Sequence, residues 1–381
     1  MGGDAASARF DAGALIRMLA RPRMTGSAGA DAVEAELRDR FEGLGFSIRS
    51  LPFHFSMTAG RFALSKIAAV YTVGMLVALL LLASERPLGA VIALSAALVL
   101  MVAGILYMRE NGIARMPWGR SQATNLWVQR AGGRPRYVFM AHRDSKSQLV
   151  PLSLRGPAIA LGIVAWIAMV VLAVMSMARF VGFAPVLLSG LVGVACGLAL
   201  VVSWPDDHSP GALDNASGLA TLLGIAERER TADDIAFLVT DAEELGLAGA
   251  RAIAPRMPPV FGVINVDGID DHGTFHVVER FGWPRKKGLA PHLAAAVLGA
   301  ADRLGMSARR RDAPFGILLD HMPLVEAGTP ALSIMRGSLR SLHRVHRPAD
   351  SVDNLTGTGV EACVELLCGA LAILRERDAK V

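Results

Sequence analysis

The chain has 381 residues, of which 52% are hydrophobic and only 19% charged, and its mean hydropathy is +0.42. Average soluble domains carry about 45–50% apolar and about 25% charged residues, so this composition argues against a wholly soluble protein. The net charge of +5 comes from dispersed basic residues, with no Lys/Arg block interleaved with aromatic residues. That distribution argues against nucleic-acid binding.

The cysteines and the N-terminal residues argue against a disulfide-rich protein with a signal peptide. Cys196, Cys363 and Cys368 are the three cysteines, and they form no CxxC pair. We therefore expect no disulfide framework. The first residues contain no apolar core of the kind that signal peptides have, so we expect no cleavable signal peptide there.

The polar parts of the chain alternate between helix-type and strand-type patterns. In chain order they predict a helix at Ala30–Leu44, strands at Thr124–Gln129 and Tyr137–Ala141, a helix at Asn215–Glu229, a strand at Ile235–Thr240, a helix at Leu247–Pro255, a strand at Val260–Val266, a helix at Pro291–Leu304, a strand at Ala331–Met335 and a helix at Gly357–Arg375. This alternation predicts an α/β fold with a mostly parallel or mixed central sheet between layers of helices.

Four uncharged apolar stretches interrupt these elements, at Ile67–Ala83, Leu88–Met108, Pro157–Ala178 and Val181–Val202. Each is about the length that crosses a bilayer. Only residues 84–87 lie between the first and second stretches, and only residues 179–180 lie between the third and fourth. The stretches therefore predict two transmembrane hairpins, at 63–108 and 156–202. Two hairpins leave segments 1–62, 109–155 and 203–381 on one side, where they can fold together as one domain.

The basic residues predict which side that is. Near the hairpin bases lie Arg61, Lys66, Arg109, Arg115, Arg120, Lys146 and Arg155, whereas the tips carry only Arg86 and Arg179. By the positive-inside rule we expect an integral protein of the bacterial inner membrane with its polar domain in the cytoplasm. The alternative is an outward-facing domain. Gly193 and Gly197 form a GxxxG pattern, which is either a helix-packing face or merely tolerated.

Metal-type side chains follow several predicted strands. His142 and Asp144 follow the strand ending at Ala141, Glu243 and Glu244 follow the strand ending at Thr240, and Asp267 follows the strand ending at Val266. Asp214 lies in a turn before a helix, and His346 lies before the last helix. Singly, such residues are usually caps or surface groups. Together, carboxylates and imidazoles at strand ends predict a zinc site.

Neighbouring residues suggest a division of roles at this site. Side chains of adjacent Glu243 and Glu244 point in different directions, so one can bind a metal while the other faces a reacting water. Asp144 is placed to orient the His142 imidazole. Three other histidines are also candidate metal ligands. His343 lies three positions before His346, His208 lies beside two aspartates, and His321 follows Asp320. We favour His346 as the ligand and interpret His208 as a solvated loop residue and His321 as structural or substrate-facing.

Several segments resemble the co-catalytic di-zinc aminopeptidases, the group containing bacterial leucyl aminopeptidase and the Streptomyces aminopeptidase. The family's AHxDS, PGAxDNASG, AEExGLxGS, NxDG and HTxxDT segments correspond in order to residues 141–145, 210–218, 242–250, 265–268 and 346–351. Its SDHxxF…GxPA and PRxTGS stretches correspond to 320–331 and 22–27. The resemblance covers essentially all of the polar segments, and five ordered motifs make it specific.

The resemblance implies a zinc-exopeptidase fold, two Zn²⁺ ions and a peptide substrate with a free N-terminus. It implies that His142 and Asp267 hold one zinc, that Glu244 and His346 hold the other, and that Asp214 bridges them. Glu243 would be the general base that takes a proton from the metal-activated water, and Asp144 would assist catalysis beside His142. Segments 1–62, 109–155 and 203–381 would then be a membrane-anchored zinc-peptidase domain.

The chain departs from the family pattern at three points. Asp214 follows His142 by 72 positions, and this gap contains the second hairpin, where the family has few residues. Val345 stands where secreted members often have a tyrosine that stabilises the tetrahedral intermediate, and Arg347 replaces the threonine of HTxxDT. Two alternatives stay open: a related amide-processing enzyme, such as a carboxypeptidase or a glutaminyl cyclase-like acyltransferase, and an inactive scaffold relative.

Overall fold

The computed structural model describes residues 10–180, 182–282, 285–314 and 317–379. The chain divides into two compact units. The first, here the α/β unit, contains the segments up to His54, Gln122–Ser147 and Asp207 onward. The second, here the helical unit, contains Phe55–Ser121 and Gln148–Asp206.

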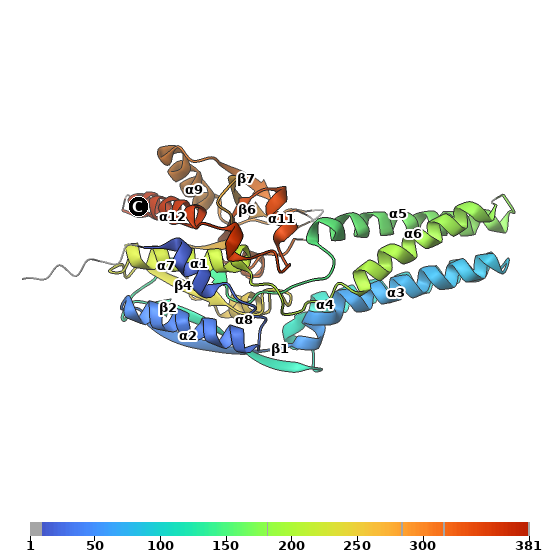
Figure 1. The fold of residues 1–381 in the computed structure, drawn as a ribbon, viewed down its shortest axis with the longest axis horizontal. Helices are drawn as coiled ribbons and strands as arrows, with labels where there is room; N and C mark the ends of the chain where they lie inside the picture. The colour runs from blue at the N-terminus through green and yellow to red at the C-terminus, as the bar shows by residue number, and fades with distance from the viewer. Residues whose placement is uncertain (1–9, 181, 283–284, 315–316, 380–381) are drawn as a thin grey trace, which may run out of the picture. The chain divides into compact units, whose positions relative to one another are not determined.

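The α/β unit is built around one mixed sheet (Figure 1). Its strands are β1 Ser47–Ser56, β2 Arg120–Gln129, β3 Tyr137–His142, β4 Ile235–Thr240, β5 Gly262–Ile269, β6 Thr274–Arg280, β7 Ala308–Asp312 and β8 Ala331–Gly337. Its α-helices are α1 Ala12–Leu19, α2 Ala28–Gly43, α7 Ser217–Arg228, α8 Ala248–Ile253, α9 Pro291–Leu304, α10 His321–Glu326, α11 Leu339–Arg344 and α12 Thr358–Asp378, with short turns η1 Ala212–Ala216, η2 Ala254–Arg256 and η3 Val352–Asn354.

The eight strands lie in the order β1-β2-β4-β3-β5-β8-β6-β7. The centre is parallel, since β3 pairs with β4 and β5, and β5 pairs with β8. The β2–β4 and β6–β8 pairs are antiparallel. The predicted mixed α/β fold is therefore confirmed, and its parallel centre brings the carboxyl ends of β3, β4 and β5 to one edge.

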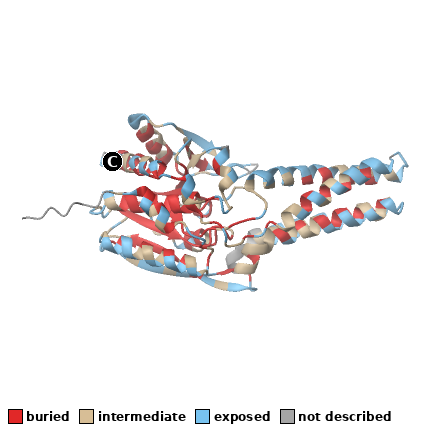
Figure 2. Cartoon of the chain, in the orientation of Figure 1, coloured by how far each residue is buried: buried red, intermediate tan, exposed pale blue. Residues whose placement is uncertain are grey.

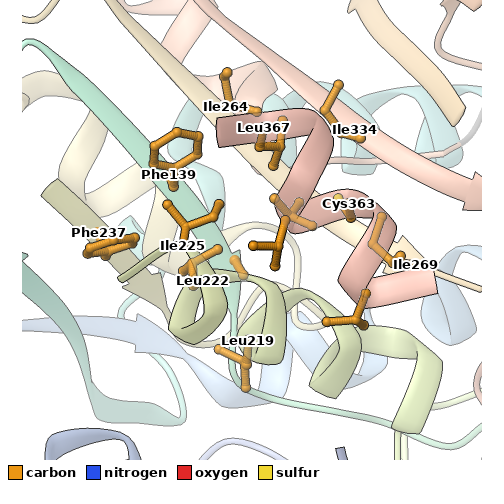
Figure 3. Packing of buried hydrophobic residues seen from close by; sticks show 14 of the residues in the cluster. Phe139, Leu219, Leu222, Ile225, Phe237, Ile264, Ile269, Ile334, Cys363 and Leu367 are labelled. Atoms are coloured by element: carbon orange, nitrogen blue, oxygen red, sulfur yellow. The ribbon is translucent and has the colours of Figure 1, made fainter. Parts of the chain in front are cut away.

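Helices cover both faces of this sheet because residues along each strand alternate between two buried clusters. Phe139, Phe237 and Ile264 belong to the larger cluster, which contains residues of α7, α9 and α12. Figure 3 shows Leu222 and Ile225 of α7 and Leu367 of α12 packed in that cluster. Val138, Met140 and Leu238 face the other side, where residues of α8 and α10 complete a second cluster.

Every predicted helix and strand is present, several with shifted ends, and some of the observed elements were not predicted. Strand β5 does not end at Val266 but continues to Ile269, so Asp267 lies within the strand. Helix α7 begins at Ser217, because non-helical dihedral angles at Asp214 and Asn215 interrupt the turn before it. The prediction missed β1, β6, β7, α1, α10 and α11. Strand β7 has the sequence ARRRD, which shows no apolar alternation because its arginines are exposed at the sheet edge.

The helical unit contains four long helices: α3 Met57–Ala83, α4 Pro87–Arg115, α5 Leu152–Met177 and α6 Phe183–Val201. Within them, Met57–Ala83, Pro87–Met108, Leu152–Met177 and Phe183–Val201 are long and apolar enough to cross a membrane. Many of their large apolar side chains are exposed, which Figure 2 shows as pale segments along each helix. The positions agree with the four predicted apolar stretches.

Small residues allow these helices to pack closely. Helix α3 contacts α4 and α6, and α5 contacts α6 and α4. A side chain added at Gly193 would collide with Met75, and one at Gly197 would collide with Thr72. The GxxxG glycines of α6 thus lie against α3, which favours the packing interpretation of the pattern. The Tyr71 hydroxyl of α3 also donates a hydrogen bond to the carbonyl of Gly162 on α5, at 2.7 Å.

Candidate active site

The sequence-predicted ligands meet at one edge of the sheet. His142 is the last residue of β3, Glu243 and Glu244 follow the end of β4, and Asp267 lies near the carboxyl end of β5. Carboxyl ends of parallel strands are where open α/β sheets carry their functional groups. All four side chains are buried, with at most 8% of their surface exposed.

His142, Asp214 and Asp267 form the first group of side chains that could hold a metal ion. The Nε2 atom of His142 lies 3.1 Å from Oδ1 of Asp214 and 3.8 Å from Oδ1 of Asp267. One imidazole nitrogen and two carboxylate oxygens converging in this way are typical zinc ligands.

Asp214, Glu244 and His346 form the second group. The Nε2 atom of His346 lies 3.1 Å from Oδ2 of Asp214 and 3.0 Å from Oε1 of Glu244. Asp214 therefore presents one oxygen to each imidazole. A carboxylate placed in this way can bridge two metal ions.

Two buried atoms test whether a metal fits these residues. Nε2 of His142 and Oε1 of Glu244 are both buried, and their close contacts with Asp214 and His346 do not have the geometry of a hydrogen bond, so neither atom has a hydrogen-bond partner among the described residues. A buried polar atom without a partner costs free energy, so such atoms are rare in native structures. Each atom belongs to one of the two groups, and an imidazole nitrogen and a carboxylate oxygen are both ligands that zinc prefers. The residues present fit a metal ion.

The loop that carries Asp214 is fixed by its backbone. Gly211 has a positive φ of 58°, and a side chain there would collide with the carbonyl of Asp214. The Asp350 carboxylate accepts hydrogen bonds from the backbone N–H groups of Leu213, at 2.7 Å, and Asp214, at 3.1 Å. Burial raises the pKa of Asp350 to about 6.

Asn215 ties the same loop to β5. Its amide donates to the carbonyl of Val266 at 2.8 Å and accepts from the N–H of Gly268 at 3.2 Å. These contacts flank Asp267 on both sides. Asp214 and Asp267, which are 53 residues apart in sequence, are thus held together by the residue that follows Asp214.

Arg23 supports the site from outside the ligand set. Its side chain is fully buried, and its guanidinium donates to the carbonyls of Arg143 at 2.6 Å, Gly211 at 2.9 Å and Pro210. One arginine therefore joins the segment after His142 to the segment before Asp214. The sequence resemblance included Arg23 within its PRxTGS stretch without giving it a role.

Asp144 contacts the site in a different way from the predicted one. The nearest acceptor to Nδ1 of His142 is the Asp144 backbone carbonyl, at 3.0 Å, whereas the carboxylate oxygen Oδ1 is 3.6 Å away. The carboxylate instead accepts the N–H groups of Glu243 and Glu244, both at 3.1 Å. Asp144 thus fixes the imidazole through its backbone and the Glu243–Glu244 turn through its side chain.

Glu243 and Glu244 differ strongly in environment. Burial raises the pKa of Glu243 well above its usual range, and the nearby carboxylates of Glu244 and Asp320 raise it further. For Glu244, burial is outweighed by His346 and Lys146, which lower its pKa to about 2. The Lys146 ammonium lies 2.6 Å from Oε2 of Glu244. The Glu243 carboxylate has no hydrogen bond or ion pair with any described residue.

The backbone around these residues is strained at two non-glycine positions. Ala242, directly before Glu243, has a φ of 56°, and His346 has a φ of 62°. Non-glycine residues rarely adopt such angles, and those that do cluster at functional sites.

The rival histidines lie outside both groups. His343 lies 3.3 Å from the Arg347 guanidinium, and the N–H of His208 donates to Ser147 at 3.0 Å. His321 is buried with Nδ1 2.7 Å from the Ser333 hydroxyl. Burial lowers the pKa of His321 to about 3, so it is neutral. Asp320 was not assigned a role from the sequence. Its carboxylate accepts from Thr240, and burial raises its pKa to about 7.

The fold and this arrangement define an α/β protein with a candidate metal centre at the carboxyl edge of its sheet. Residues 194–371 match the model of Peptidase family M28. The match includes the positions of Asp214, Glu243, Glu244, Asp267 and His346. No curated protein matches the chain significantly.

Solved structures share the fold at low sequence identity. A zinc aminopeptidase from Bacillus subtilis is 14% identical, with 95% of this chain and 93% of that chain covered and a TM-score of 0.54. An aminopeptidase from Aneurinibacillus sp. strain AM-1 is 13% identical, with coverages of 95% and 93% and a TM-score of 0.54. A glutaminyl cyclase from Fimbriiglobus ruber is 15% identical, with coverages of 94% and 93% and the same TM-score.

Together, these comparisons show that residues 194–371 are similar to Peptidase family M28 and that the chain shares the fold of zinc aminopeptidases and glutaminyl cyclases. The presence of glutaminyl cyclases among the neighbours leaves the particular reaction open.

Proposed function

We propose that the protein is a membrane-anchored, zinc-dependent aminopeptidase that removes N-terminal residues from peptides. In this proposal His142, Asp214 and Asp267 hold one zinc ion, and Asp214, Glu244 and His346 hold a second. The observation that carries the proposal is the placement of Asp214, whose two oxygens each lie 3.1 Å from the Nε2 atom of a different histidine.

The residues of the chain would divide the work as follows. Bound zinc ions would supply Lewis acidity and make a water molecule more acidic. Glu243 takes the proton of the attacking water and returns it to the leaving amine. Its carboxylate is buried and has no hydrogen bond or ion pair with any described residue, which suits a group that must both accept and release a proton. Glu244, with its lowered pKa, stays ionised and suits a ligand.

Glutaminyl cyclization is the second candidate, favoured by the similarity to the glutaminyl cyclase fold. There Glu243 would carry a proton from the attacking α-amine to the departing ammonia. Both candidates need a substrate with a free N-terminus, so the products distinguish them.

One experiment tests the function directly. The purified full-length chain is analysed for metal content and then given aminoacyl-amides, N-terminal glutaminyl peptides and N-blocked peptides. We expect about two zinc ions per chain and release of the first residue. Release of ammonia without cleavage would favour the cyclase, and turnover of N-blocked peptides alone would favour a carboxypeptidase. Zinc binding without any turnover would favour an inactive relative.

Asp214→Asn is the matching variant for the ligand assignment. A bridging carboxylate serves both ions, so its replacement should lower metal content at both sites and abolish turnover. His343→Ala is the control, because His343 lies outside both groups, and it should keep the zinc. A chain that holds no metal at neutral pH after purification without chelator would contradict the proposal.

We further propose that four transmembrane helices form two hairpins and that the catalytic domain, made of 1–62, 109–155 and 203–381, lies in the cytoplasm. The support is four helices of spanning length and the basic residues near the hairpin bases. Single cysteines at Ser84 and Ala232 can be labelled on intact cells with a membrane-impermeant reagent. We expect labelling at Ser84 only. Labelling at Ala232 only would reverse the sidedness, and labelling at both would contradict the hairpins.

A further inference from the structure

A cavity of about 380 Å³ lies in the α/β unit, away from the candidate metal centre. Its lining includes Arg49 of β1, Trp127 of β2, Arg134 and Arg136 before β3, and Pro258 and Pro259 before β5. Arg136 directly precedes β3, and His142 ends it. Six residues of strand separate them by roughly 20 Å. The cavity therefore lies at the amino end of β3, whereas the candidate metal centre lies at its carboxyl end.

The cavity has an excess of positive charge. Arg49 and Arg134 are exposed, and their side chains make no hydrogen bond or ion pair with any described residue. Arg136 is partly neutralised, since its guanidinium lies 3.0 Å from the Asp378 carboxylate and stacks over Phe261 at 4.3 Å. No carboxylate is among the described residues that line the cavity. Three guanidinium groups against one carboxylate leave a local charge of about +2.

The rest of the lining is apolar or already satisfied. Trp127 is 3% exposed, and its indole N–H donates to Gln129 at 2.7 Å. The Gln129 amide in turn donates to the carbonyl of Gly133 at 3.3 Å. Pro258 and Pro259 offer no N–H donor. The donors left for a ligand are therefore the guanidinium groups of Arg49 and Arg134, beside an indole and two rigid rings.

We propose that this cavity binds a phosphate monoester with a compact, planar or apolar substituent. A phosphate monoester carries a charge of about −1.5 to −2 at neutral pH, which matches the excess of the site. Guanidinium groups bind phosphate oxygens in a forked geometry. The volume is near the lower end of the range for small-molecule sites, about 300–1,000 Å³, and leaves room for a substituent against Trp127 and the prolines. This site is independent of the proposed peptidase activity.

Calorimetry on the detergent-solubilised full-length chain tests the site with phenyl phosphate, which combines the phosphate with a flat ring. Arg49→Gln and Arg134→Gln should each weaken binding by about tenfold or more, because each removes charge-assisted hydrogen bonds. Both side chains are exposed, so these variants should fold normally. Arg230→Gln, which removes another exposed arginine of the same unit, is the control and should bind like the wild type.

Phosphate can also bind metal ions, so Asp214→Asn is measured in parallel. Binding kept in Asp214→Asn and lost in Arg134→Gln supports the cavity. Binding lost in Asp214→Asn and kept in both arginine variants overturns the proposal, because the anion is then at the metal centre. Equal affinity for benzoate overturns the choice of phosphate.

A second arm identifies the source of the phosphate. The chain is placed in nanodiscs with and without phosphatidic acid, a lipid that carries a phosphate monoester. If phosphatidic acid reduces phenyl phosphate binding through Arg49 and Arg134, the site takes a lipid headgroup. If it has no effect while phenyl phosphate still binds, the site takes a free phosphate ester. Absence of binding in both arms overturns the proposal.

Discussion

The α/β unit and the helical unit bury opposite kinds of side chain. Every charged residue that is buried among the described residues belongs to the α/β unit, and many of them surround the candidate metal centre. The helical unit buries few polar residues in the described part of the chain, and none of them is charged: Ser56, Ser65, Thr72, Gln148 and Ser203. Its interior is filled by small and apolar residues such as Ala78, Gly193 and Met169.

The surfaces show the reverse contrast. Most large apolar residues that are exposed in the described ranges belong to the helical unit, and in the α/β unit they are limited to Phe261, Leu289, Leu304 and Leu318. Contiguous exposed apolar surface marks contact with a partner or with lipid. Buried charge is thus concentrated around the candidate site in the α/β unit, whereas exposed apolar surface is concentrated on the helical unit.

The largest expected effect is the loss of turnover on replacing Glu243, the buried residue that is proposed to transfer a proton. Glu243→Gln should reduce turnover by about 10²–10⁴-fold while the chain keeps its zinc, because the amide cannot accept the proton. Glu244→Gln should instead lower metal content. Turnover and metal content are measured on the same preparations. If Glu243→Gln loses zinc and Glu244→Gln keeps it, the two roles are exchanged.

Arg23 tests whether buried charge also stabilises the fold. Arg23→Gln leaves the carbonyls of Arg143, Pro210 and Gly211 without their shared donor, which should cost about 3 kcal/mol or more. Denaturant unfolding of the solubilised chain measures this cost. Arg21→Gln is the matched control, since Arg21 is exposed and donates to the Met18 carbonyl at 2.6 Å. Similar losses in both variants would show that burial of Arg23 is not the cause.

Val99 tests the proposed contact with lipid. It is 66% exposed in α4, within the apolar part of that helix. Val99→Asp should cost roughly 2.5–3.5 kcal/mol of membrane insertion, as a charge near the centre of a spanning helix does. Val99→Leu should insert normally. Insertion is measured as the fraction of chain that resists alkaline extraction from membranes. Unchanged insertion of Val99→Asp would mean that this surface does not face lipid.

The smallest expected effect is at a partly exposed ion pair. Arg375 donates to both oxygens of Asp234, at 2.7 and 2.6 Å, and lowers the pKa of that carboxyl. Since the folded pKa lies below the unfolded value of about 3.9, the pair stabilises the fold fully above that value. The contribution is lost as the pH falls through the folded pKa.

Thermal unfolding as a function of pH measures this contribution. Asp234→Asn should lower stability by about 1 kcal/mol at neutral pH, as expected for a partly exposed pair. The difference from the wild type should vanish in strong acid. A difference that grows as the pH falls would contradict the assignment of the pair.

The local sequence determined most elements and the types of residue at the site. Uncharged stretches of spanning length sufficed for the four long helices, because length and hydropathy alone define such segments. Helix α9 was predicted at its observed bounds, Pro291–Leu304, since proline at its start and glycine after its end mark both limits. The five metal-type residues stood out because they lie at strand ends and in turns, in the order of a known family.

Only the tertiary structure decided how distant residues combine. No local sequence pattern distinguishes Arg23 from an exposed arginine. Its burial depends on carbonyl groups from segments about 120 and 190 positions away. The backbone carbonyl of Asp144 contacts His142, and its carboxylate accepts two backbone N–H groups. This arrangement depends on the turn after β4, which brings those N–H groups to the carboxylate. The arginine cavity likewise joins β1, β2 and the loops before β3 and β5. Sequence patterns report local periodicity, whereas hydrogen bonds and charge at such sites depend on which segments the sheet places side by side.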